Sequence, residues 1–189
     1  LAAAPHASLN DDAALVNDLD PAAKDLEGYL FPETYTLPRG AAASKLISLM
    51  VARFRTTYTE IEQKKSGDLD LSLRQLVTLA SLVEKETGKA EERPLVAAVY
   101  RNRLDRKMAM QADPTVVYAL VQAGTYDGNI RKQDLSFDSP YNTYKYSGLP
   151  PGPIASPGRA SLEAALAPAT VDYLYFVSLN DGSHAFAET

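Results

Sequence analysis

Two glutamates near the end of an apolar segment are the residues best suited to acid–base chemistry. Residues 80–88 have the sequence ASLVEKETG, so Glu84 and Glu86 fall in the last turn of a predicted helix. The negative end of the helix dipole disfavours an ionised carboxylate there by roughly 0.3–1 kcal/mol. Two interpretations stay open: both glutamates are solvated, which is the commoner case, or one carboxyl is kept protonated as a general acid.

The two glutamates lie on different sides of the predicted helix. Positions 84 and 86 are roughly 200° apart around the helix axis, so their side chains cannot share one role. Glu84 adjoins Val83 and borders the predicted apolar stripe, where burial can raise its pKa. Glu86 lies closer to the line of Leu79 and Leu82, and its loss is expected mainly to weaken binding.

Two motifs further along the chain offer the groups with which proteins bind sugars. The first is QADPT at residues 111–115 and the second is YNTY at residues 141–144. Their amides and hydroxyls can bond to sugar hydroxyls, and tyrosine rings can cover the C–H faces of a sugar. Each also has a commoner structural interpretation, Asp113 as a helix N-cap and the second motif as an ordinary turn.

Other reaction classes lack the residues that they need. The chain has no cysteine and only two histidines, His6 and His184, so no thiol nucleophile and no transition-metal site is predicted. Neither a glycine-rich phosphate loop nor a common serine-nucleophile motif occurs. His184 lies in a predicted terminal hairpin, where a surface or structural role is expected. The net charge of −5 argues against nucleic-acid binding, so we expect carboxylate catalysis without a cofactor.

The elements that must position these groups are mostly helices. The 189 residues, 46% of them hydrophobic, suffice for one ordinary domain, and no apolar run approaches the roughly 18 residues of a membrane span. Residues 125–158, rich in proline near their end, are expected to be irregular, and residues 173–186 are a predicted β-hairpin. The expected fold class is therefore α+β, a helical domain with short strands. Apolar spacing, capping sequences and glycine stops predict helices at residues 41–65, 72–87, 94–106, 113–123 and 161–167.

Seven short motifs together resemble the YceG-like endolytic murein transglycosylases. They occur in the family's order and cover nearly the whole chain: LEGYLFPETY (26–35), ASLVEKET (80–87), NRL (102–104), QADPTVVY (111–118), YNTY (141–144), GLPPGPI (148–154) and LYFV (174–177). The family's catalytic glutamate, carried over by motif, falls on Glu84. The side chains expected to contact the substrate are Glu86, Asn102, Gln111, Asp113, Thr115, Tyr141, Asn142, Thr143 and Tyr144.

The resemblance implies a bacterial enzyme that acts on peptidoglycan outside the cytoplasmic membrane. Residues 1–25 would be the tail of a truncated LysM-like domain and a linker, and residues 26–189 the catalytic domain. The family has one transmembrane anchor, so membrane contact would be through a segment absent here. It cuts the β-1,4 bond after N-acetylmuramic acid within glycan strands, leaves 1,6-anhydro ends, and is thought to terminate nascent strands. Its implied partners are glycan strands and penicillin-binding peptidoglycan synthases.

One carboxylate suffices for this chemistry, because the sugar's own C6 hydroxyl attacks the anomeric carbon. Glu84 would protonate the glycosidic oxygen and then take the hydroxyl proton, a double role that suits a pKa raised toward about 6. Two rival functions stay open. One is a non-catalytic glycan-binding module, and the other is a lysozyme-like hydrolase in which Glu84 works with Asp113 or Glu33.

Overall fold

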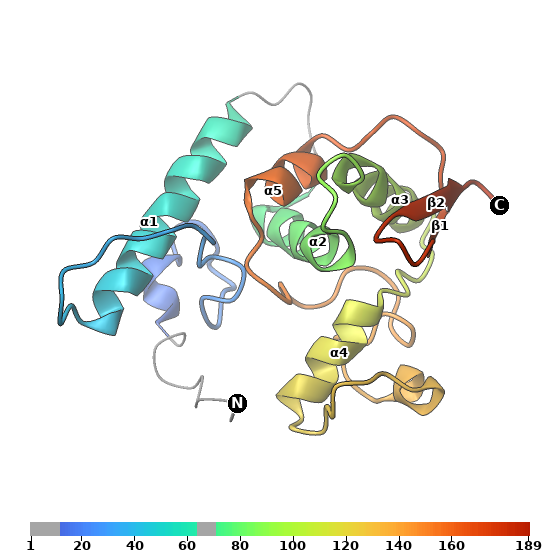
Figure 1. Cartoon of the computed structure of the whole chain (residues 1–189), viewed down its shortest axis with the longest axis horizontal. Coiled ribbons are helices and arrows are strands. Elements are labelled where there is room, and N and C mark those ends of the chain that lie inside the picture. Colours follow the sequence, from blue (N-terminus) through green and yellow to red (C-terminus); the bar gives the residue numbers. More distant parts are fainter. Residues whose placement is uncertain (1–11, 64–70) are drawn as a thin grey trace.

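The computed structural model describes residues 12–63 and 71–189, a helical body that ends in a two-stranded hairpin (Figure 1). This arrangement confirms the expected α+β class. His6 and the predicted end of the first helix near residue 66 lie outside the described residues. The elements are η1 (Ala13–Leu15), α1 (Ala43–Glu62), α2 (Leu73–Glu86), α3 (Arg93–Asp105), α4 (Asp113–Gln122), η2 (Lys132–Ser136), α5 (Arg159–Leu166), β1 (Tyr175–Ser178) and β2 (His184–Ala187).

The five helices α1 to α5 confirm the five predicted helices, with ends that differ by a few residues. The capping box that starts α2 is present: the Gln75 N–H donates to Ser72 Oγ at 3.3 Å, and the Ser72 N–H donates to Gln75 Oε1 at 2.9 Å. One capping prediction is wrong. Ala112 occupies the N-cap of α4, and the Asp113 carboxylate accepts a hydrogen bond from the Tyr144 hydroxyl at 2.5 Å instead.

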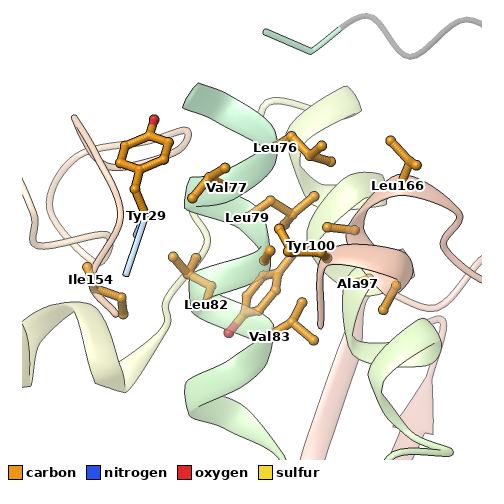
Figure 2. Close-up of a cluster of buried hydrophobic side chains, with 14 of the residues drawn as sticks. Tyr29, Leu76, Val77, Leu79, Leu82, Val83, Ala97, Tyr100, Ile154 and Leu166 are labelled. Atoms are coloured by element: carbon orange, nitrogen blue, oxygen red, sulfur yellow. The ribbon is translucent and has the colours of Figure 1, made fainter. Parts of the chain in front are cut away.

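Helix α2 lies at the centre of the core. It contacts α3, α4 and α5, and every residue from 76 to 83 is buried. Figure 2 shows Tyr29 and Ile154 against one side of α2 and Tyr100 and Leu166 toward the other. Helix α2 is therefore packed on all sides along this stretch. Polar residues in its last turn, just after residue 83, have their backbone close to the interior of the domain.

The loop before α1 packs closely against α2 at Gly28. This glycine has a φ of +90°, and a Cβ added to it would lie 2.5 Å from Pro153 Cγ and 2.8 Å from Val77 Cγ1. Both the left-handed backbone and the close approach therefore favour glycine at this position.

Gly28→Ala is expected to lower the free energy of unfolding by about 1–3 kcal/mol, because overpacking adds to the backbone strain. Gly40→Ala is a matched control, since Gly40 has a φ of +81° but no atom within 4 Å of the added Cβ. Urea unfolding of both variants measures the difference. Equal losses in the two variants would contradict the close packing at residue 28.

Part of the segment before residue 26 also packs against the helical body. Val16 is fully buried in the same hydrophobic cluster as α2. Asp20, only 4% exposed, accepts hydrogen bonds at 2.7 Å from the Tyr29 hydroxyl and from Arg74 on α2. These contacts hold residues 16–20 against the helical body. The packed part of the chain therefore begins before residue 26.

The C-terminal hairpin is held against α3 by polar side chains. Strands β1 and β2 are antiparallel, with Ser178 opposite His184. Asn102 Nδ2 donates to the carbonyls of residues 171 and 173, and Arg103 Nε donates to the carbonyl of residue 174 at 2.6 Å. Across the described part of the chain, no helix combines the length and the apolar character that crossing a bilayer demands.

Candidate active site

A cavity of about 250 Å³ lies where the end of α2 meets the start of α4 and the hairpin. Segments far apart in the sequence therefore line one site. The sequence predicts four of its residues as substrate contacts, namely Glu86, Gln111, Asp113 and Tyr144. The full lining consists of Glu86, Arg103, Met110, Gln111, Asp113, Tyr144, Phe176, Ser178 and His184.

Glu86 is the last residue of α2 and the carboxyl that this helix brings to the cavity. It lies about one turn beyond Leu82 and two turns beyond Leu79 on the same face of the helix, and both leucines are fully buried. The buried Tyr100 hydroxyl donates to Glu86 Oε1 at 2.5 Å. Among the described residues no group donates to Oε2, so this second oxygen can present a proton to a ligand.

Burial raises the pKa of Glu86 above its ordinary value, and the negative charge of Asp113 raises it further. The hydrogen bond from Tyr100 and the charges of His184 and Arg103 act in the opposite direction and offset part of the rise. A raised pKa increases the protonated fraction near neutral pH. That is the state in which a carboxyl can act as a general acid.

The wall that carries Asp113 is built from a strained loop and an aromatic ring. Gln111 has a φ of +51°, and its N–H donates to the Thr143 carbonyl at 3.2 Å. A non-glycine residue in this region costs about 1–3 kcal/mol, and residues held in this way cluster at ligand sites. The Tyr144 hydroxyl donates to Asp113, and burial raises the pKa of Tyr144, so the phenol stays protonated.

Glu84, the glutamate that the sequence predicts as catalytic, does not line the cavity. Its Oε2 accepts hydrogen bonds from the Gly158 N–H at 3.1 Å and from the Ser161 hydroxyl at 2.6 Å, at the N-terminus of α5. Its Oε1 lies 3.7 Å from an Arg93 nitrogen on α3. Glu84 therefore joins α2 to α5 and α3, and the geometry favours Glu86 over Glu84 as the acid.

Three of the predicted substrate contacts are buried and bonded to protein. Thr115, Asn142 and Thr143 are at most 1% exposed. The two threonine hydroxyls lie 2.9 Å apart, and Thr143 Oγ1 also accepts from the Ala112 N–H. Asn142 Nδ2 donates to two carbonyls within residues 135–137. In this structure their side chains therefore brace the loops beside the cavity, and their contact with a substrate stays a prediction.

The two remaining predicted contacts lie outside the cavity lining. Asn102 uses its amide to hold the chain that leads into β1. Tyr141 is half-buried, and its ring packs against Tyr118 with the centroids 4.8 Å apart. Both side chains support the fold around the site.

Five lining residues are not among the predicted contacts: Arg103, Met110, Phe176, Ser178 and His184. The sequence predicts a surface or structural role for His184; its side chain is only 11% exposed and contacts Glu92, which favours the structural alternative. Its ring packs edge-on to Phe176, with the centroids 5.4 Å apart. The sequence held one hint, that Phe176 and His184 lie in opposite arms of a predicted hairpin, but nothing tied that hairpin to Glu86.

The cavity holds groups suited to cleaving a polar ligand. A carboxyl with a raised pKa can protonate a leaving oxygen, and the nearby carboxylate, amide and phenol can bond to hydroxyls. Within residues 12–63 and 71–189, no group of three or more His, Asp or Glu side chains is arranged so that it could hold a metal ion. The fold and the site thus define a helical domain with a polar cavity, into which it brings one carboxyl with a raised pKa.

The chain belongs to the YceG-like family, whose model matches residues 3–189. It is 44% identical over 166 residues to a Bacillus subtilis protein named endolytic murein transglycosylase, an alignment that covers 87% of this chain and 45% of the relative. A Streptococcus pneumoniae protein of the same name is 40% identical over 162 residues, covering 81% of this chain and 28% of the relative. The chain thus spans about half or less of the length of these relatives.

A solved structure extends the similarity to the fold. The crystal structure of a YceG-like protein from Listeria monocytogenes matches 96% of this chain and 62% of its own, with a TM-score of 0.77 and 37% sequence identity. The helical body with its hairpin is therefore a fold of this family.

Proposed function

We propose that this chain is the catalytic part of a peptidoglycan lytic transglycosylase, with Glu86 as its general acid. The names of the Bacillus and Streptococcus relatives support the activity. The observation that supports the residue is the geometry of Glu86, which lines the cavity with one oxygen bonded to Tyr100 and the other open. The bond cleaved would be the β-1,4 linkage between N-acetylmuramic acid and N-acetylglucosamine inside a strand.

Glu86 would protonate the glycosidic oxygen as its bond to C1 breaks. The C6 hydroxyl of the same muramic acid then attacks C1, closes a 1,6-anhydro ring and releases its proton to a base in the site. Such an internal nucleophile can have an effective molarity of about 10⁵ M or more, so no activated water is needed. No second carboxylate is therefore needed to activate a water molecule, whereas a hydrolase normally needs two carboxylates.

The proposal also places the protein in the cell. Peptidoglycan lies outside the cytoplasmic membrane, so the chain would act there, as part of a longer anchored protein. Cuts inside nascent strands would set the point at which a penicillin-binding synthase stops extending them. These steps rest on the proposed activity.

A hydrolase is a second candidate, because Asp113 lines the same cavity as Glu86 and could activate a water molecule. Glu33 is a poorer partner for this role, since it forms an ion pair with Arg53 at 2.6 Å and does not line the cavity.

The products separate the two candidates. Digestion of polymeric glycan in ¹⁸O water is expected to leave unlabelled ends about 18 mass units lighter than hydrolysis products, because no water is added. Mass spectrometry of the released muropeptides measures both properties. Labelled reducing ends as the main product would instead assign the protein to the hydrolases.

A further inference from the structure

Glu92 and His184 form a largely buried pair beside the cavity, and His184 is the member that lines it. Glu92, 7% exposed, precedes α3, and His184 begins β2. The carboxylate of Glu92 lies 2.7 Å from His184 Nδ1 and accepts the His184 N–H at 3.0 Å and the Thr87 hydroxyl at 3.0 Å. Three contacts thus fix one carboxylate against one imidazole.

This geometry sets the tautomer of His184. The hydrogen bond from the His184 side chain lowers the pKa of Glu92, so Glu92 is ionised and can only accept. The proton between the two groups therefore belongs to Nδ1, and in the neutral ring Nε2 carries a lone pair. Among the described residues Nε2 has no partner and is not enclosed, and the ring lines the cavity with Glu86.

We propose that His184 Nε2 is the base that takes the proton of the C6 hydroxyl, oriented by Glu92. The inference rests on the proposed function and divides its proton transfers between two residues. Glu86 gives its proton to the glycosidic oxygen as the C1–O4 bond breaks. The C6 oxygen forms the new bond to C1 and loses its proton to Nε2. Solvent then carries that proton from the imidazolium to Glu86, so the cycle leaves both groups as they began.

Glu92 is the positioning residue of this pair. Its carboxylate holds the ring in one tautomer and stabilises the imidazolium that forms when Nε2 takes a proton, as in other carboxylate–histidine pairs. Both acidic and basic side chains line the cavity around His184. The titratable and charged groups that face His184 from the surrounding elements are Glu86, Glu92, Arg103, Asp113 and Tyr144.

Two substitutions of His184 separate its possible roles. In His184→Asn the side-chain amide can still donate to Glu92, but nothing replaces Nε2. In His184→Gln an amide lies near the place of Nε2 and can form hydrogen bonds, but it cannot take a proton. If Nε2 is the base, both variants should lose turnover by roughly 10²–10⁴-fold with KM little changed. The pH profile of turnover should also change in both variants, because each lacks the proton acceptor of the wild type.

Glu92→Gln should keep part of the turnover, since it disturbs the tautomer but leaves the imidazole in place. Melting temperatures verify that each variant is folded. A long-range ¹H–¹⁵N spectrum supplies an independent reading, because the chain has only two histidines. It should show His184 with the proton on Nδ1 in the resting state.

Wild-type turnover in folded His184→Asn would overturn the inference and leave His184 as a structural residue. Wild-type turnover in His184→Gln alone would also overturn it, since a hydrogen bond would then suffice. The proposed function fails separately: hydrolytic products from the unmodified protein would remove the C6 hydroxyl as the proton donor, whatever the His184 variants do.

Discussion

Glu86→Gln should lower turnover on polymeric glycan by at least the roughly 10²–10⁴-fold that the loss of a general acid costs. The amide is nearly the same size as the carboxyl and can still accept the hydrogen bond from Tyr100. Its N–H protons are not acidic enough to be given to the leaving oxygen, so the loss should appear in kcat while KM changes little. Steady-state rates on the same glycan preparation measure both values.

The same substitution should stabilise the fold at neutral pH. In the unfolded chain the pKa of a glutamate is about 4.3, whereas burial raises the pKa of Glu86 in the folded chain. Between these two values the folded state binds more protons, so stability falls as the pH rises through that window and stays lower above it. Glutamine carries no charge. The melting temperatures of the two proteins should therefore coincide near pH 4 and separate toward pH 7, with the variant more stable.

Glu84→Gln is the matched control, two residues away in the same turn. It removes a carboxylate that accepts from Gly158 and Ser161, so its expected effect is a loss of stability with turnover largely kept. An inactive but folded Glu84→Gln beside an active Glu86→Gln would show that the sequence motif identified the right carboxyl and the geometry did not. Activity in both variants would favour a non-catalytic glycan-binding module.

The choice between these glutamates shows where a sequence pattern is incomplete. The apolar stripe through Val83 predicts one buried face for α2, and Glu84 borders it. The structure buries α2 on all sides from residue 76 to 83, so the line of Leu79 and Leu82 is core as well, and Glu86 extends it into the cavity. Helical periodicity gives the angle between two side chains around the helix axis. Which of these side chains are buried depends on how α3, α4 and α5 pack against the helix.

Local signals predicted the elements well because their causes are local. The capping box of Ser72 and Gln75 sets the start of α2, and the turn at residues 180–182 separates β1 from β2. Both depend only on residues close together in the sequence, and both are present. The wall of the cavity is different, since Glu86 and His184 come together only when the hairpin docks on α3. Nothing within a few residues of either side chain encodes that meeting. Composition alone excluded whole reaction classes, but it could not bring these groups together.

Asn142→Ala should lower the free energy of unfolding by about 2–4 kcal/mol. The side chain is fully buried, donates to two carbonyls of residues 135–137, and accepts from the Tyr144 N–H at 3.0 Å. Alanine would leave three part-buried backbone groups without this partner, and the loss stays below the roughly 1–3 kcal/mol each of fully buried groups because water reaches them in part. Thermal unfolding measures the loss, at roughly 2–4 °C per kcal/mol for a chain of this size.

Asn129→Ala is the control, an exposed asparagine in the same irregular stretch, and it should change stability by less than about 0.5 kcal/mol. The comparison also tests how the YNTY motif works. If Asn142 held a sugar, its alanine variant would keep its melting temperature and show a raised KM, which would contradict the structural role. If it braces the loop that carries Tyr144, stability should fall first. Any loss of affinity should then follow the loss of order around the Tyr144–Asp113 hydrogen bond.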